Sequence, residues 1–216
     1  MEPESIKEYG VKKYERRWAR DFIKELENYG IQSILFDVKV PDGSLYFESS
    51  KTNAKVTNGY TPFLPDLTSA AKESEISLYP RIVCFLDDIW KGKWSIDRDG
   101  KSIKGKVCPT NSDYRDYLLN IITEVLELDG IGDNGGIVLD AIEFVDPDST
   151  GTALDADLCF CRTCADAFFN TYKRNFSEWG EWRCNQINDF VEKIEMRCEV
   201  KNVPLGVEID FDPRKE

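Results

Sequence analysis

Helical stripes alternate with short apolar runs along this chain, and this alternation restricts the fold more than any other feature of the sequence. Between Tyr14 and Tyr29, apolar residues recur with the period of an amphipathic helix. The run Ser33–Val38 that follows is almost entirely apolar, which is typical of a strand buried on both faces of a sheet. Helices that alternate with buried strands predict parallel βαβ units.

The same pattern continues to the end of the chain. Further helices are predicted over 67–77, 114–128, 165–169 and 182–200, further strands over 81–86, 137–142 and 205–210, and a weaker strand over 6–11. Right-handed crossovers lead either to a doubly wound sheet or to a (β/α) barrel. A complete barrel needs about 250 residues, and this chain has 216. We therefore expect an α/β fold, a partial or reduced (β/α) TIM-barrel-like parallel sheet, with long mouth loops over 39–65 and 89–109. Residues 1–216 should form one domain that is incomplete at its C-terminus.

Charge and hydropathy exclude several classes of function. The chain has 40 acidic and 28 basic residues, a net charge of −12, so its surface should repel phosphate backbones and we expect no nucleic-acid partner. No apolar run is long enough to span a membrane, and the acidic start of the chain does not resemble a signal peptide. We expect a cytoplasmic protein without a membrane partner.

The cysteines and the missing histidines restrict the chemistry further. The chain contains no histidine, which excludes imidazole bases and imidazole ligands. Seven cysteines cannot all pair, so reduced thiols are expected. Cys159, Cys161 and Cys164 have spacings that let three thiolates reach one tetrahedral ion, with Cys108 or Asp157 as the fourth ligand. This predicts a structural zinc site, and simple loop packing is the alternative.

Carboxylates recur where the predicted strands end. They are Asp37, Asp87 and Asp88, Asp140 and Glu143, and Glu208 and Asp210. Keeping such an acid charged among buried apolar residues costs several kcal/mol unless something binds it. Because parallel strands end at one edge, these acids should converge there, where they would suit glycoside cleavage or divalent metal binding. Helix capping and ion pairing are the competing interpretations.

Several motifs in sequence order resemble a known group of proteins. Segment 36–47 (Phe-Asp-Val-Lys-Val-Pro-Asp-Gly-Ser-Leu-Tyr-Phe), Cys-Pro-Thr-Asn at 108–111, segment 114–119, Gly-Ile-Val-Leu-Asp at 136–140 and the cysteine motif that begins at 159 are similar to glycoside hydrolase-like TIM barrels related to α-L-fucosidases and β-galactosidases. The resemblance covers about residues 14–210. It implies that Asp140 is the nucleophile. Where many relatives have a pattern like Asp-Tyr-Ile-Arg-Tyr, this chain has Asp-Ala-Ile-Glu-Phe, so Glu143 is either a second carboxylate partner for Asp140 or the sign of a different substrate.

Roles for the other acids follow from this chemistry. A retaining mechanism needs a protonated carboxyl about 5 to 5.5 Å from the nucleophile, for which Glu208 is the first candidate. The expected substrate-binding residues are Asp37, Lys39, Asp88, Trp90 and Asp210, with Lys39 neutralising the acids and Trp90 stacking on a sugar ring. Such catalysis requires no cofactor.

Two other functions fit the same sequence. A chain with few strands could be a non-catalytic carbohydrate-binding or assembly module. Alternatively, Asp37, Asp87, Asp88 and Asp140 could hold Mg²⁺ or Ca²⁺ in a metal-dependent hydrolase. Because an unclosed barrel leaves strand edges exposed, we also expect a homo-oligomer.

Overall fold

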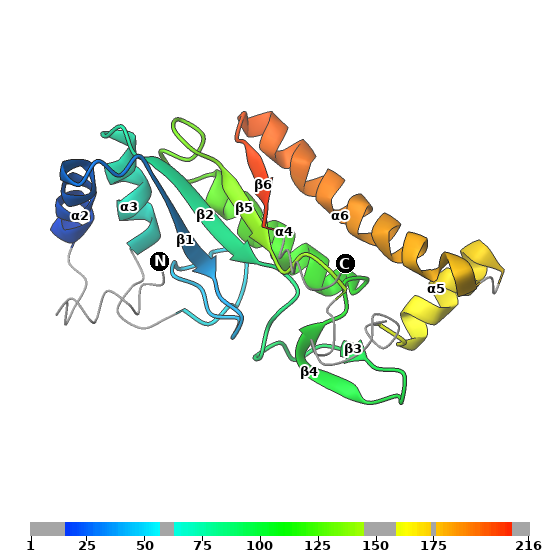
Figure 1. The fold of residues 1–216 in the computed structure, drawn as a ribbon. Coiled ribbons are helices and arrows are strands. Elements are labelled where there is room, and N and C mark those ends of the chain that lie inside the picture. Colours follow the sequence, from blue (N-terminus) through cyan, green and yellow to red (C-terminus); the bar gives the residue numbers. More distant parts are fainter. Residues whose placement is uncertain (1–15, 57–62, 145–158, 174–175, 209–216) are drawn as a thin grey trace.

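The computed structural model describes residues 16–56, 63–144, 159–173 and 176–208. Its main sheet has four strands, β1 (Ser33–Lys39), β2 (Ser77–Val83), β5 (Ile137–Asp140) and β6 (Leu205–Val207), which lie side by side in that order (Figure 1). All neighbouring strands are parallel. The predicted α/β class with a parallel sheet is therefore confirmed, and the described part of the chain does not close into a barrel.

The five described α-helices are α2 (Arg16–Asn28), α3 (Phe63–Lys72), α4 (Ser112–Leu126), α5 (Arg162–Tyr172) and α6 (Trp179–Lys201), with a short 3₁₀ helix over Phe176–Glu178. Four of them pack on one face of this sheet, and the fifth, α5, belongs to a separate smaller core. Buried residues of α3, α4 and α6, such as Leu67, Ile122 and Ile194, share one core with alternate strand residues such as Phe36 and Ile82. The other face of the sheet is more open, and Leu35 on β1 is 39% exposed there.

The predicted element boundaries differ from those observed at β2. The sequence predicts that this strand runs from 81 to 86 after Pro80, because proline lacks the N–H that a ladder requires. In the structure β2 begins at Ser77, and Pro80 lies within it opposite Phe36 of β1. The preceding helix ends correspondingly early, at Lys72. The weak strand pattern over 6–11 lies outside the described residues.

A hairpin occupies the long loop predicted over 89–109. Strands β3 (Trp94–Ile96) and β4 (Ser102–Val107) are antiparallel, and Gly100 takes a positive φ of 81° in the turn between them. The hairpin lies beyond the carboxyl end of β2, near α5 (Figure 1). The backbone N–H of Phe160 donates to the carbonyl of Ile96 over 2.8 Å, so the hairpin contacts the segment that leads into α5.

A second, smaller core lies under α5 and the start of α6. It contains three of the cysteines together with Phe168, Trp179 and Trp182. Within the described ranges, no helix combines the length and the hydropathy that a membrane crossing would need. Self-association through the edge strands β1 and β6 remains a prediction.

Candidate active site and metal centre

Arg81 lies at the centre of the strand-end carboxylates. It stands opposite Asp37 of β1 in the sheet, and its guanidinium forms a two-point ion pair with that carboxylate, from Nε to Oδ1 and from Nη2 to Oδ2 over 3.1 Å. Its Nη1 donates to Oε2 of Glu208 over 2.8 Å and lies 3.9 Å from Oδ2 of Asp140. Hydrogen bonding to Asp37 is the main reason that the pKa of Arg81 is raised. One cation therefore joins three of the predicted acids.

The backbone turns sharply directly after Asp140. Ala141 has a positive φ of 48°, which is unfavourable for a residue with a β-carbon and is often found at functional sites. The Ala141 N–H donates to Oδ1 of Asp140 over 2.6 Å. The carbonyls of Asp140 and Ala141 accept from the N–H groups of Cys84 and Phe85, at 2.8 and 3.2 Å. The carboxylate that ends β5 is thus fixed by its own turn.

Asp140, Glu143 and Glu208 line one open cleft of about 610 Å³. The last strand brings Glu208 here because β6 pairs with β5 and the Glu208 N–H donates to the Leu139 carbonyl over 2.8 Å. The opposite wall comes from α6, through Ile187, Asn188 and Val191. A cleft of this volume is suited to a small ligand. The structure thus brings together the three residues predicted to be catalytic.

Lys39 is completely buried. Its ammonium donates to the carbonyls of Val83 and Leu86, at 3.1 and 2.8 Å, and lies 3.6 Å from Oδ2 of Asp87. Burial lowers the pKa of Lys39, and the charge of Asp87 opposes that shift. These contacts fix the carboxyl end of β2, so Lys39 neutralises Asp87, whereas Arg81 neutralises Asp37.

The other predicted substrate-binding residues lie apart from this cleft. Asp37 is buried beneath Arg81, Asp88 is exposed, and Trp90 lines a different cavity. The Asp88 side chain lies close to Gly105 of β4, where a β-carbon would come within 2.3 Å of Oδ1. Asp210 lies outside the described residues.

Replacing Arg81 with Met should destabilise the fold. Asp37 is 2% exposed, so losing its partner leaves a buried carboxylate without compensation, at a cost of about 3–5 kcal/mol. Urea unfolding measures this free energy. The double variant Arg81→Met with Asp37→Leu should regain most of the loss, since it removes the stranded charge as well. A single-variant loss below about 1 kcal/mol would show that the ion pair does not support the sheet.

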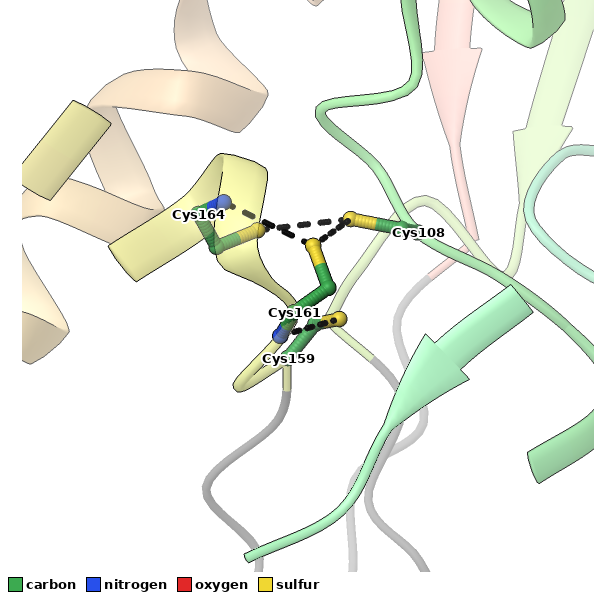
Figure 2. A group of neighbouring side chains, drawn as sticks. All are labelled: Cys108, Cys159, Cys161 and Cys164. Atoms are coloured by element: carbon green, nitrogen blue, oxygen red, sulfur yellow. Dashed lines mark hydrogen bonds between the residues drawn. The ribbon is translucent and has the colours of Figure 1, made fainter. Parts of the chain in front are cut away.

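Four cysteines form a second candidate site. Cys108 follows β4, whereas Cys159, Cys161 and Cys164 lie at the start of α5, and Figure 2 shows their sulfurs pointing toward one another. All four Sγ atoms lie within 4.8 Å of one another. The Cys108 sulfur is 3.8 Å from that of Cys161 and 3.3 Å from that of Cys164. A tetrahedral zinc ion with Zn–S bonds of 2.3 Å places its sulfurs about 3.8 Å apart.

The surroundings of the sulfurs also suit a thiolate centre. Backbone N–H groups of Ile96 and Cys161 donate to the sulfur of Cys159, at 3.1 and 3.4 Å, and the N–H of Cys164 points to the sulfur of Cys161. Hydrogen bonding within the cluster lowers the pKa values of Cys159 and Cys161, with Cys108 as the largest cause, and raises those of Cys108 and Cys164. The cluster can therefore bind a metal such as zinc, and Cys108 is placed to be the fourth ligand; the alternative, Asp157, lies outside the described residues.

Comparisons with known proteins identify a fold but no family. No family model and no curated protein matches the chain. A hypothetical protein from Ruminiclostridium thermocellum ATCC 27405 has a TM-score of 0.59 and 16% identity over 90% of this chain and 92% of its own. The pneumococcal virulence factor StrH, solved in a study of N-glycan recognition and hydrolysis, gives 0.56 and 11% over 90% of this chain and 50% of its own. The α-L-fucosidase AlfC from Lactobacillus casei gives 0.49 and 14% over 87% and 50%.

The first two of these likenesses show a shared fold. The chain spans about half the length of the StrH and AlfC chains. Its structural neighbours therefore include glycoside hydrolases, at low sequence identity and partial coverage of those enzymes.

Sequence reasoning did not identify Arg81 as part of the site. The available signal was a lone cation inside an otherwise apolar strand, on the same face as Tyr79 and Val83 by the alternation of side chains. A charge in that position needs a counter-charge on a neighbouring strand, and the acids at the ends of β1, β5 and β6 provide three.

Proposed function

We propose that this chain is a glycoside hydrolase-like protein that binds and cleaves a carbohydrate in the cleft beside Asp140. The observation that carries this proposal is that Asp140, Glu143 and Glu208, from two strand ends far apart in sequence, line one cleft. Paired carboxylates across a cleft are the usual equipment for glycoside cleavage. The shared fold with StrH, whose study concerns N-glycan hydrolysis, supports the same substrate class.

We further infer that the sheet is part of a (β/α) barrel. Strand order follows chain order, and α3, α4 and α6 contribute to one core on a single face of the sheet. A doubly wound sheet would instead carry helices on both faces. In a barrel, active sites lie at the carboxyl ends of the strands, which is where Asp140 and Glu208 stand.

The geometry around Asp140 suits a nucleophile. One carboxylate oxygen accepts the Ala141 N–H, and the other lies 3.9 Å from the Arg81 guanidinium. In a retaining mechanism a carboxylate in this place attacks the anomeric carbon. The side chain is 30% exposed, so a substrate in the cleft can reach it.

The proton donor is better assigned to Glu143 than to Glu208. A general acid must carry a proton at the start of the reaction. Oε2 of Glu208 accepts a hydrogen bond from Arg81 over 2.8 Å, so this oxygen is directed at Arg81 and not at a leaving group in the cleft. Glu143 lines the same cleft and is exposed to the ligand. Glu208 then orients Arg81. Asp88 lies apart from the cleft, so we propose that it binds only hydroxyls of a sugar unit that extends beyond the cleft.

Two variants distinguish these roles, measured as kcat/KM on p-nitrophenyl and alkyl glycosides of the same sugar. Glu143→Gln should lower turnover of the alkyl glycoside about 10²- to 10⁴-fold, because its leaving group needs a proton. The p-nitrophenyl substrate should be much less affected, since nitrophenolate leaves without one. Glu208→Gln should affect both substrates alike. The opposite pattern would make Glu208 the acid.

A non-catalytic carbohydrate-binding module is the second candidate, and the ion pairs of Arg81 favour it. A guanidinium that neutralises Asp37 and Glu208 also leaves a cleft that can bind sugar without cleaving it. Sugar binding by the wild-type chain, with no release of nitrophenol from any of the fucoside, galactoside and N-acetylglucosaminide substrates, would establish this alternative.

The metal-dependent hydrolase receives no comparable support. Asp37 is paired with Arg81, and Asp87 contacts Lys39 and lies 3.1 Å from the Tyr114 hydroxyl. Among the described residues, the four cysteines are the group arranged to hold an ion. We propose that they bind structural zinc, because four protein thiolates leave no open position for a substrate.

A further inference from the structure

A second cavity, of about 580 Å³, lies outside the Asp140 cleft. It is bounded by segment 51–54, segment 87–92 and the first half of α4, and it shares no lining residue with that cleft. Leu86 lines the Asp140 cleft, and its neighbour Asp87 lines the second cavity. The two sites therefore lie on either side of one short segment, and the residues proposed for glycoside cleavage do not account for the second.

Two aromatic residues form a preorganised part of the wall. Trp90 and Tyr117 both line the cavity, and their ring centroids are 5.5 Å apart. Trp90 also contacts the buried Tyr114 edge-on at 4.8 Å. The Tyr114 hydroxyl lies 2.9 Å from the Cys84 carbonyl oxygen, which fixes this ring in the core. Rings held in this way present apolar area at little cost in conformational entropy.

The opposite wall is also held in place. Glu124 of α4 accepts the N–H groups of Ser50 and Lys51, at 2.6 and 3.1 Å, as well as the Ser50 hydroxyl. The Lys51 ammonium lies 3.1 Å from Glu127, so its charge is already compensated. Segment 51–54 is therefore fixed against α4 before any ligand arrives, which lowers the cost of binding.

The polar groups of the cavity suit a neutral ligand. Asp113, Asp116 and Asn120 line it from one face of α4, at the three- and four-residue spacing of helix neighbours, and Thr52 and Asn53 contribute from the facing segment. Lys91 adds a cation beside these acids. The balance of charges does not favour a phosphate or a free cation, whereas carboxylate and amide groups beside aromatic rings match vicinal hydroxyls and the apolar face of a sugar.

We propose that this cavity is a second carbohydrate-binding site, which takes a neutral oligosaccharide and performs no chemistry on it. Trp90 and Tyr117 contact the apolar faces of the sugar rings, and Asp116 and Asn120 hydrogen-bond to the hydroxyls. The inference goes beyond the proposed hydrolysis, because binding here does not depend on the carboxylates of the Asp140 cleft.

Calorimetric titration of the full chain with five neutral pentasaccharides (cello-, xylo-, manno-, laminari- and chitopentaose) tests the proposal. The titrations use the Asp140→Asn background, so that turnover cannot consume the ligand. At least one sugar should bind, and Asp116→Ala and Asn120→Ala should each weaken it about tenfold, the loss of one hydrogen bond to a hydroxyl. Asn170→Ala, at an exposed position of α5, should leave the affinity unchanged.

Trp90→Ala adds a test of the aromatic contact. Because Trp90 packs on Tyr114, this variant is used only if its circular dichroism matches the wild type. Asp116 and Asn120 are exposed, so replacing them should not disturb the fold, and their variants test the proposal even if Trp90→Ala does not fold. Absence of binding by all five sugars, binding that only Glu143→Gln and Glu208→Gln weaken, or tighter binding of inorganic phosphate than of any sugar would each overturn the proposal. Retained binding in a chain without hydrolase activity would support this site and count against the catalytic proposal alone.

Discussion

One zinc ion per chain should be found in the purified protein, and its removal should lower the melting temperature by about 8–16 °C. A ligand at a thousand times its Kd stabilises the folded state by about 4 kcal/mol, and about 2–4 °C corresponds to each kcal/mol in a chain of this size. Elemental analysis measures the metal, and thermal unfolding with and without a chelator measures the shift.

Loss of the ion should lower the melting temperature because the four cysteines link the β3–β4 hairpin to the start of α5. Cys108 follows the β3–β4 hairpin, and the other three begin α5, which leads into α6. The core around them is small and separate from the main core. Without the ion, the near-ultraviolet signal of Trp179 and Trp182 should weaken, because both rings pack in that small core. The ligands must lose protons to bind, so affinity should fall as the pH is lowered.

Cys164→Ser should abolish metal binding and reproduce the loss of stability. Cys184→Ser is the matched control, since Cys184 is an exposed thiol outside the cluster. Substitution with cobalt adds a direct readout, because tetrahedral thiolate coordination gives a characteristic visible absorption that Cys164→Ser should remove. A protein that contains no metal, and whose melting temperature the chelator leaves unchanged, would show that the cysteines only pack together.

Strands of the main sheet could be predicted where a local run of apolar residues marks a buried segment. Runs such as 33–38 and 137–142 are apolar enough to mark buried strands, and β1 and β5 begin at the first residue of each run. The sequence predicts a loop in place of the β3–β4 hairpin because β3 has three residues, too few for a period to be recognised. The predicted start of β2 was wrong because proline, although disfavoured within sheets, is accommodated at position 80 of this parallel strand.

The convergence of acids could also be predicted, but not their partners. Parallel strands must end at one edge, so Asp140 and Glu208 meet for a topological reason. Which cation reaches them depends on register. Register places Arg81 beside Asp37 and within reach of Asp140, and a one-residue shift would turn Arg81 to the other face of the sheet. The burial of Lys39 could not be predicted either, because it depends on the carbonyls of Val83 and Leu86 and on Asp87, which only the fold brings to its ammonium.

Asp140→Asn should reduce kcat/KM on the preferred p-nitrophenyl glycoside about 10⁴-fold while the protein remains folded. Removing a catalytic nucleophile commonly costs at least this much. The amide cannot form the glycosyl intermediate, although it can still accept the Ala141 N–H that fixes the turn. Asp21→Asn is the control, since it makes the same change at an exposed position of α2.

Covalent trapping identifies the nucleophile independently of the mutant rates. A 2-deoxy-2-fluoro glycoside forms an intermediate that hydrolyses slowly, so mass spectrometry of the digested protein should find the sugar on the peptide that contains Asp140. The Asp140→Asn variant should remain unlabelled. Label on Glu208 would transfer the nucleophilic role to that residue, which would have to release Arg81 first. Full activity of Asp140→Asn would remove the strand-end acid from the mechanism, and the cleft would then serve binding alone.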